Sequence, residues 1–87
     1  MSHPFDEQDT DIENGREIDL EMLREDLMGE LQAINQYQEH IEILENEDAI
    51  SVLEHIRDDE KEHVAELVKM IQKLDPVQAE KLKKGTL

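Results

Sequence analysis

Residues 20–44 read LEMLREDLMGELQAINQYQEHIEIL, and residues 49–74 read AISVLEHIRDDEKEHVAELVKMIQKL. In each stretch one set of positions recurs at alternating steps of three and four residues, which is the spacing of the buried side of a packed helix. We call each set a seam. The first seam is Leu20, Leu23, Leu27, Glu30, Ile34, Tyr37, Ile41, Leu44, and the second is Ala49, Leu53, Ile56, Glu60, His63, Leu67, Met70, Leu74.

The two seams predict two long helices in one antiparallel hairpin. Only residues 46–48 interrupt the pattern, and a connection that short joins antiparallel neighbours. We expect the first helix to run from about Ile18, with Asp19 as a possible cap, to Leu44 or Glu45. The second helix would begin at Asp48 as its cap and end near Lys73.

A short third helix is predicted after the hairpin. Asp75 can cap it, Pro76 suits its first position, and Gly85 ends it. Residues 1–17, in contrast, are rich in Asp, Glu and Asn and show no helical period, so we expect a disordered acidic arm there. The folding domain would then be residues 18–87.

Composition excludes several classes of function. The chain has 87 residues, no cysteine and a formal net charge of −15, which removes disulfides and thiol chemistry and opposes binding to nucleic acid or anionic membranes. Its apolar runs are far shorter than the roughly 20 residues that span a bilayer, and no signal peptide is evident, which favours the cytoplasm. A hairpin of this size also buries little apolar surface, so we expect oligomerisation.

Glu30, Glu60 and His63 are the exceptions in the seams. A buried unpaired charge costs on the order of several kcal/mol, and carboxylate oxygen and imidazole nitrogen are both metal ligands. Glu30 lies about as far before the connection as His63 lies after it, and Glu60 shares the face of His63 at i, i+3. All three therefore converge in one layer of the hairpin. Tyr37, two turns after Glu30, could direct its hydroxyl at this site or simply fill the core.

One Glu and one Glu-x-x-His make half of a di-iron site. Ferritin-like four-helix bundles supply a Glu from each of two helices and a Glu-x-x-His from each of the other two. Two copies of this chain would complete that set as a dimer, in which Glu60 bridges the metals and Glu30 and His63 are terminal ligands. Against this interpretation, Glu-x-x-His is common on acidic helices, and polar core residues can simply fix register.

The segments Glu30–Tyr37, read ELQAINQY, and Asp58–His63, read DDEKEH, resemble the encapsulated ferritins, a two-helix group related to ferritins and rubrerythrins. The resemblance covers roughly residues 18–84. It implies a ferroxidase that oxidises Fe(II) with oxygen at a di-iron centre shared between two protomers. It further implies Glu30, Glu60 and His63 as ligands with Tyr37 nearby, dimers assembled into a decameric ring, and storage of iron as cargo inside an encapsulin nanocompartment.

The chain departs from that family at three positions. Gly29 and Gln32 stand where relatives often carry acidic residues of an outer metal-uptake site, and Gln36 stands where an aromatic is often found. Two other functions stay open. A rubrerythrin-like peroxide reductase is disfavoured because no rubredoxin-type cysteines are present, and a metal-free acidic dimerisation module remains the alternative from another class.

Overall fold

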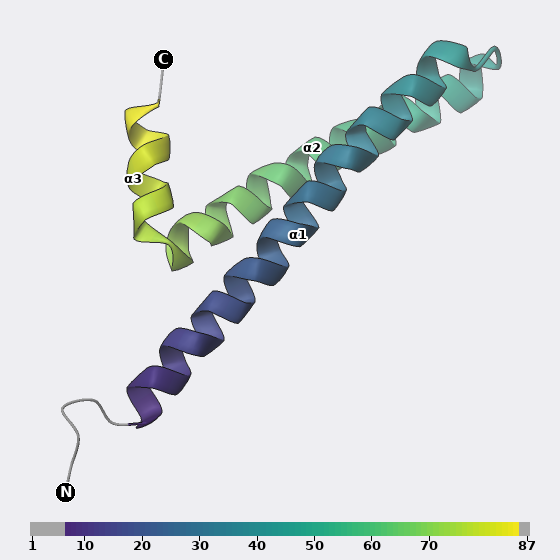
Figure 1. Cartoon of the computed structure of the whole chain (residues 1–87). Coiled ribbons are helices and arrows are strands. Elements are labelled where there is room, and N and C mark those ends of the chain that lie inside the picture. The colour runs from purple at the N-terminus through teal and green to yellow at the C-terminus, as the bar shows by residue number, and fades with distance from the viewer. Residues whose placement is uncertain (1–6, 86–87) are drawn as a thin grey trace, which may run out of the picture.

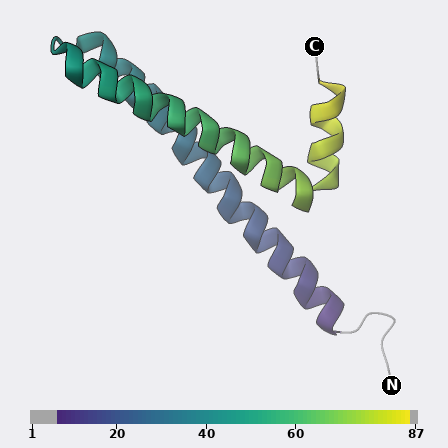
Figure 2. The same cartoon turned by 180° about the vertical axis from the view of Figure 1, so that it is seen from behind.

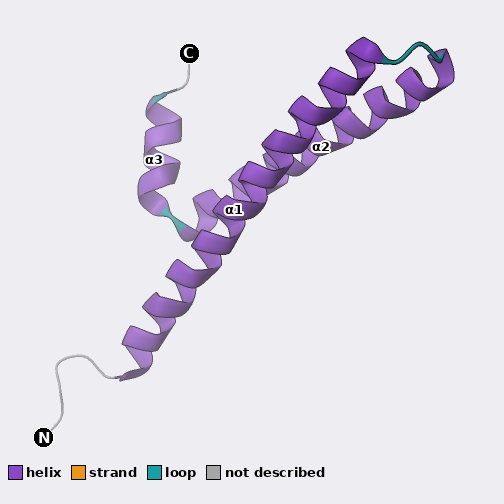
Figure 3. Ribbon diagram, turned by 45° about the vertical axis from the view of Figure 1, so that its right-hand side comes forward, coloured by secondary structure: helices purple, strands orange, loops and turns teal. Residues whose placement is uncertain are grey.

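The computed structural model describes residues 7–85, with side chains from residue 12 onward. This part of the chain contains three helices and no strand: α1 (Glu7–Ile43), α2 (Glu47–Leu74) and α3 (Pro76–Lys84), joined by short loops (Figure 3). The predicted all-α class is confirmed. None of these described helices is both long enough and apolar enough to cross a membrane.

α1 and α2 form the predicted antiparallel hairpin, and the two opposite views agree that they lie side by side from the connection onward (Figures 1 and 2). The connection is residues 44–46. The side chain of Asn46 accepts a hydrogen bond of 2.8 Å from the backbone N–H of Ala49 and so caps α2. The prediction of Asp48 as the cap was wrong. Asp48 lies in the first turn, where its charge still favours the helix dipole.

The start of α1 also corrects the sequence-based boundary. The helix begins at Glu7, so residues 7–17 are helical where we expected a disordered arm, and Asp19 lies inside the helix. No proline lies between Pro4 and Pro76, and a helix that is already nucleated gains one hydrogen bond for each further residue that it orders. Residues 1–6 lie outside the described part, and a division into arm and domain stays a prediction. In Figure 1 this first part of α1 projects past the end of α2.

α3 forms as the sequence predicts. Asp75 is its N-cap and accepts a hydrogen bond of 3.0 Å from the backbone N–H of Gln78, Pro76 opens the helix, and Gly85 ends it. Pro76 has no N–H to lose at this position, and its fixed φ suits a first helical turn. α3 packs against α2 and turns steeply away from the hairpin axis (Figure 1).

The hairpin has almost no interior of its own. Among the described residues only Leu20 and Ile71 are fully buried hydrophobics, at 1% and 5% exposure. The radius of gyration is 19.0 Å and the chain measures 71 × 28 × 14 Å, whereas a compact chain of this length would have a radius of about 12 Å. The chain is therefore a thin, open pair of helices that leaves apolar surface uncovered. Dimerisation into a four-helix bundle remains a prediction.

Candidate metal centre

Two polar contacts between α1 and the rest of the chain fix the register of the hairpin. Near the connection, Nη1 of Arg57 donates a hydrogen bond of 2.8 Å to the side-chain oxygen of Gln38. At the open end, Nη2 of Arg24 donates one of 3.0 Å to Oδ2 of Asp75, across the junction of α2 and α3. The layer that carries the three ionisable seam residues lies between these two contacts in the chain.

Glu30, Glu60 and His63 come together in that layer, and we call them the triad. Nδ1 of His63 lies 3.5 Å from Oε2 of Glu30 and 3.6 Å from Oε2 of Glu60. One ligand atom from each of the three residues falls within 4.8 Å of the other two. These separations exceed those of good hydrogen bonds, but ligands bound at about 2.1 Å to one ion lie about 3 to 3.5 Å apart. The convergence is observed, and the role of the triad as metal ligands stays a prediction.

Glu30 supplies the strongest sign that a cation belongs here. Its Oε2 atom is buried and has no hydrogen-bond partner, and an unpaired buried acceptor is unusual in a folded protein. The Glu30 and Glu60 side chains are 26% and 19% exposed, whereas His63 is 48% exposed at the edge. The two carboxylates are thus the more buried part of the triad, and the imidazole is the more exposed part. Oxygen and nitrogen donors of this kind fit a first-row divalent metal such as Fe(II), Mn(II) or Zn(II).

The triad opens into a shallow groove of about 610 Å³ along one side of the hairpin. It is lined by both helices, through Leu23, Glu25, Asp26, Gly29, Glu30, Ala33, Glu60, His63, Glu66, Leu67 and Met70. The groove is open to solvent over its length. The triad residues come from both helices, and the open groove beside them leaves room for further donors from water, substrate or a second protein chain.

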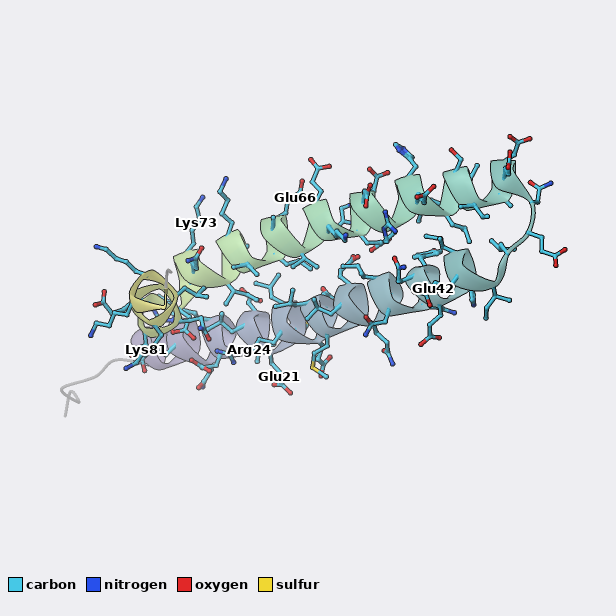
Figure 4. All side chains as sticks on the ribbon, turned by 90° about the horizontal axis from the view of Figure 1, so that it is seen from above. Glu21, Arg24, Glu42, Glu66, Lys73 and Lys81 are labelled. Atoms are coloured by element: carbon cyan, nitrogen blue, oxygen red, sulfur yellow. The ribbon has the colours of Figure 1, made fainter. Side chains whose placement is uncertain are left out.

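The groove contains three acidic residues that the sequence analysis did not single out, namely Glu25, Asp26 and Glu66. Asp26 lies one turn before Glu30 on α1, and Glu66 lies at i+3 from His63 on α2. The same helical spacing that linked Glu60 to His63 could have revealed both. Other charged residues lie outside the groove: Figure 4 shows Glu21 and Glu42 on the side of α1 that faces away from α2.

The structure also shows where the other residues considered in the sequence analysis lie. Tyr37 is half-buried on α1 and is not among the residues that line the groove, so its expected nearness to the metal stays a prediction. His40 is exposed, as expected. His55 is exposed as well, with Nε2 3.4 Å from Asp59. Gly29 lines the groove with open space in front of it, so no neighbour in the same chain approaches it.

Asp75 provides a contrast with the triad within the same hairpin. The hydrogen bond from the backbone N–H of Gln78 lowers the pKa of the Asp75 carboxyl most; desolvation opposes it, and the Arg24 side chain adds to the lowering, so that the pKa lies below its usual range. Both oxygens of this carboxylate therefore have protein partners. It caps a helix and joins α1 to α3, and it needs no ion.

Fold and site together define a class: a ferritin-like helical hairpin that places two carboxylates and an imidazole in one layer. The particular family follows from comparison with known sequences. The EncFtn-like family matches residues 5–86, and the chain belongs to that family.

Two curated relatives are similar to most of the chain. The encapsulin nanocompartment cargo protein EncC of Myxococcus xanthus is 44% identical over 70 residues, which cover 80% of this chain and 50% of that protein. The ferritin-like–encapsulin shell fusion protein of Pyrococcus furiosus is 36% identical over 66 residues, which cover 76% of this chain and 19% of that protein. The chain thus spans about half the length of the first relative and about a fifth of the second. No solved structure gave a significant match.

Proposed function

We propose that this chain is a ferroxidase that oxidises Fe(II) to Fe(III) with oxygen, at a di-iron site completed by two copies of the chain. The observation that carries the proposal is the convergence of Glu30, Glu60 and His63 around the unpaired Oε2 of Glu30. Membership of the EncFtn-like family supports iron as the metal. Each chain holds half of the ligand set that ferritin-like di-iron bundles use.

The residues of the triad have separate tasks in this proposal. Glu30 and Glu60 supply negative charge from partly buried positions, where a carboxylate attracts a cation more strongly than it does in bulk water. His63 adds a nitrogen donor from a more exposed position. Iron bound there would supply the electrons that reduce oxygen. Asp26 and Glu66 in the same groove add negative charge along the approach of Fe(II) from solvent.

The second part of the proposal is that the chain works as cargo of an encapsulin shell, inside a nanocompartment in the cytoplasm. The support is the similarity to a cargo protein of Myxococcus xanthus and to a shell fusion protein of Pyrococcus furiosus. The open two-helix chain, only 14 Å thick, agrees with this. Because it encloses no volume of its own, stored ferric iron would need a separate container. Assembly of dimers into a ring also remains a prediction.

Anaerobic titration with Fe(II), followed by exposure to oxygen, tests the enzymatic part. We expect saturable binding of about one Fe(II) ion per chain and rapid appearance of Fe(III) absorbance when oxygen is added. Binding with no oxidation above the buffer rate would remove the ferroxidase activity. If peroxide reacts much faster than oxygen, the peroxide reductase would be favoured, and if the protein binds no iron, the metal-free dimerisation module would be favoured.

Co-expression with an encapsulin shell protein tests the cargo assignment. The chain should co-purify with intact shells and resist added protease until the shells are opened. A cytoplasmic protein of similar size, produced in the same cells, is the control. Equal recovery of the two proteins with shells would contradict the assignment.

A further inference from the structure

Met70 brings a sulfur atom into the groove beside the triad. It lines the groove together with the three triad residues, and its side chain is 42% exposed. The sequence holds four methionines and no cysteine, so the thioether of methionine is the sulfur group that an oxidant can attack in this chain. Among the described residues, the groove lining contains no other methionine and no tyrosine. The groove therefore holds one readily oxidised side chain, close to the proposed iron site.

The helix places the Met70 side chain where a product of the triad would meet it. Met70 lies at i+7 from His63 in α2, which is about two turns and about 10 Å along the helix, on nearly the same face. Helical side chains lean toward the N-terminus of their helix, and this direction runs from Met70 back toward His63. Glu66 and Leu67, which lie between them in the chain, line the same groove. A small molecule released at the triad can thus reach Met70 without leaving the groove.

The other described methionines are more exposed but do not line the groove. The side chain of Met28 is 68% exposed, and that of Met22, which shares an adjoining hollow with Met70, is 52% exposed. Met28 precedes Glu30 by two positions, and at about 100° for each residue it faces nearly the opposite side of α1. An oxidant in bulk solution should attack methionines in order of exposure, and so Met28 before Met70. An oxidant made at the triad would reverse that order.

We propose that Met70 is a site of oxidation to methionine sulfoxide by hydrogen peroxide that is made at the paired triads. This inference rests on the proposed function. Two Fe(II) ions give one electron each, so one oxygen molecule takes up two electrons and two protons and leaves as hydrogen peroxide. The sulfur lone pair of Met70 then bonds to one peroxide oxygen, the O–O bond breaks, and the other oxygen leaves as water. The sulfur is oxidised by two electrons, and the peroxide is reduced.

The reaction gives Met70 a task in the same groove that Fe(II) enters. Each chain would consume one peroxide molecule before that molecule reaches solution. The product is a polar side chain in place of a flexible apolar one, and enzymes that reduce methionine sulfoxide restore the thioether. Because Met70 also lines the hollow that contains Met22, Leu23 and Leu74, oxidation would make that apolar surface more polar as well.

The test exposes the full chain to two sources of oxidant. In the first, anaerobic protein loaded with Fe(II) receives oxygen in the presence of catalase, which destroys any peroxide that reaches bulk solution. In the second, iron-free protein receives added hydrogen peroxide without catalase. Peptide mass spectrometry measures the sulfoxide at Met70 and at Met28, and absorbance measures Fe(III) in the same samples. Glu60→Gln, treated as in the first arm, controls for iron that reacts in solution.

We expect the two arms to give opposite orders of oxidation. With Fe(II) and oxygen, Met70 should carry about 10-fold more sulfoxide than Met28, because a source beside its target raises the effective concentration of the reagent there. With added peroxide, Met28 should be oxidised at least as fast as Met70. Glu60→Gln should form neither rapid Fe(III) nor sulfoxide at Met70.

Met70→Leu and Met28→Leu test whether Met70 captures peroxide. Leucine conserves the volume of methionine but has no sulfur. Without catalase, Met70→Leu should release more peroxide for each Fe(III) formed than the wild type does, by up to about one molecule per chain, and Met28→Leu should match the wild type. A peroxide dye measures this release. Equal release from all three proteins would contradict capture by Met70.

The remaining outcomes separate this inference from the proposed function. Formation of Fe(III) with as much sulfoxide at Met28 as at Met70 would overturn the inference and leave the ferroxidase standing. Preferential oxidation of Met70 by added peroxide would also overturn it, because the selectivity would then belong to the side chain and not to the source. A wild type that forms no Fe(III) would remove the proposed function and this inference together.

Discussion

The hairpin carries two sites at which carboxylates meet groups from distant parts of the chain, and they differ in how their oxygens are satisfied. At the junction of α2 and α3, Asp75 receives hydrogen bonds from Arg24 and from the backbone of Gln78. At the triad, the buried Oε2 of Glu30 has no hydrogen-bond partner, and the nearest polar contact given for it is Nδ1 of His63 at 3.5 Å. The first arrangement is complete without any ligand. In the proposed function a cation completes the second, so substitutions at the two sites should have opposite consequences.

Glu60→Gln should produce the largest effect. It keeps the size of the side chain but removes a charge that faces the metal, so iron binding should fall from about one ion per chain to near zero. The matched variant is Glu62→Gln, because Glu62 is exposed and outside the groove, where a carboxylate contributes little. Iron stoichiometry of the two proteins decides the matter. Equal loss in both would mean that general acidity, and not the triad, binds iron.

Glu30→Ala and His63→Ala should uncouple activity from stability. Each removes one ligand, and even weakening the support of a ligand can cost 10- to 100-fold in metal affinity, so we expect a drop of at least about 10-fold in the rate of Fe(II) oxidation. The metal-free Glu30→Ala protein should unfold at the same or higher urea concentration, with a gain of up to about 1 kcal/mol, because the unpaired oxygen is gone. Wild-type oxidation rates in both variants would contradict the assignment.

Metal should stabilise the wild type and not the triad variants. Fe(II) that binds the folded dimer and not the unfolded chain raises the free energy of unfolding by about 2.7 kcal/mol at 100 times its dissociation constant. Thermal unfolding under argon, with and without Fe(II), measures this, and sedimentation reports the accompanying shift from monomer to dimer. Asp75→Asn serves as the control and should gain as much from Fe(II) as the wild type, because Asp75 is not among the residues that line the groove.

Asp75→Ala should have a smaller and local effect. It removes the acceptor for the Gln78 N–H and the partner of Arg24, so α3 should fray while iron binding is unchanged. Asn can still cap a helix, so Asp75→Asn should retain most of α3. Hydrogen exchange of the α3 amides separates these outcomes. Loss of iron binding in Asp75→Ala would show that the two sites are coupled.

Acid should destabilise α3, because protonation of Asp75 weakens the interactions that hold the start of this helix. The folded chain lowers the pKa of Asp75, so the stabilisation is fully present above the ordinary carboxyl pKa of about 3.9 and is lost as pH falls through the lower folded value. The exchange rate of α3 amides, corrected for the intrinsic effect of pH, should therefore rise below about pH 4 in the wild type. Asp75→Asn should lack this dependence. An identical profile in the two proteins would assign the acid sensitivity to other carboxylates.

The sequence predicted the helices and the convergence of the triad because both depend on short, regular spacing. The two seams fix which sides of the helices meet, and equal distances from the connection place Glu30 level with His63. The start of α1 could not be predicted from spacing, because residues 7–17 have no apolar period. These residues are helical because they continue a helix that is already formed. The Arg24–Asp75 contact joins residues 51 positions apart. No local sequence pattern predicts that these two residues will form a contact.

The three-residue connection at 44–46 ties the lengths of the two helices together. One residue inserted on either side, between the connection and the triad, would shift that half of the layer by about 1.5 Å and rotate it by about 100°. Only a matching insertion in the other helix could bring the triad residues level with one another again, and the rotation would still turn one of them out of the groove. Insertions should therefore be tolerated beyond the triad, in the projecting first turns of α1 or after Gly85, but not within the 32 residues from Leu31 to Glu62. If the triad binds metal as proposed, this part of the hairpin must therefore keep a constant length.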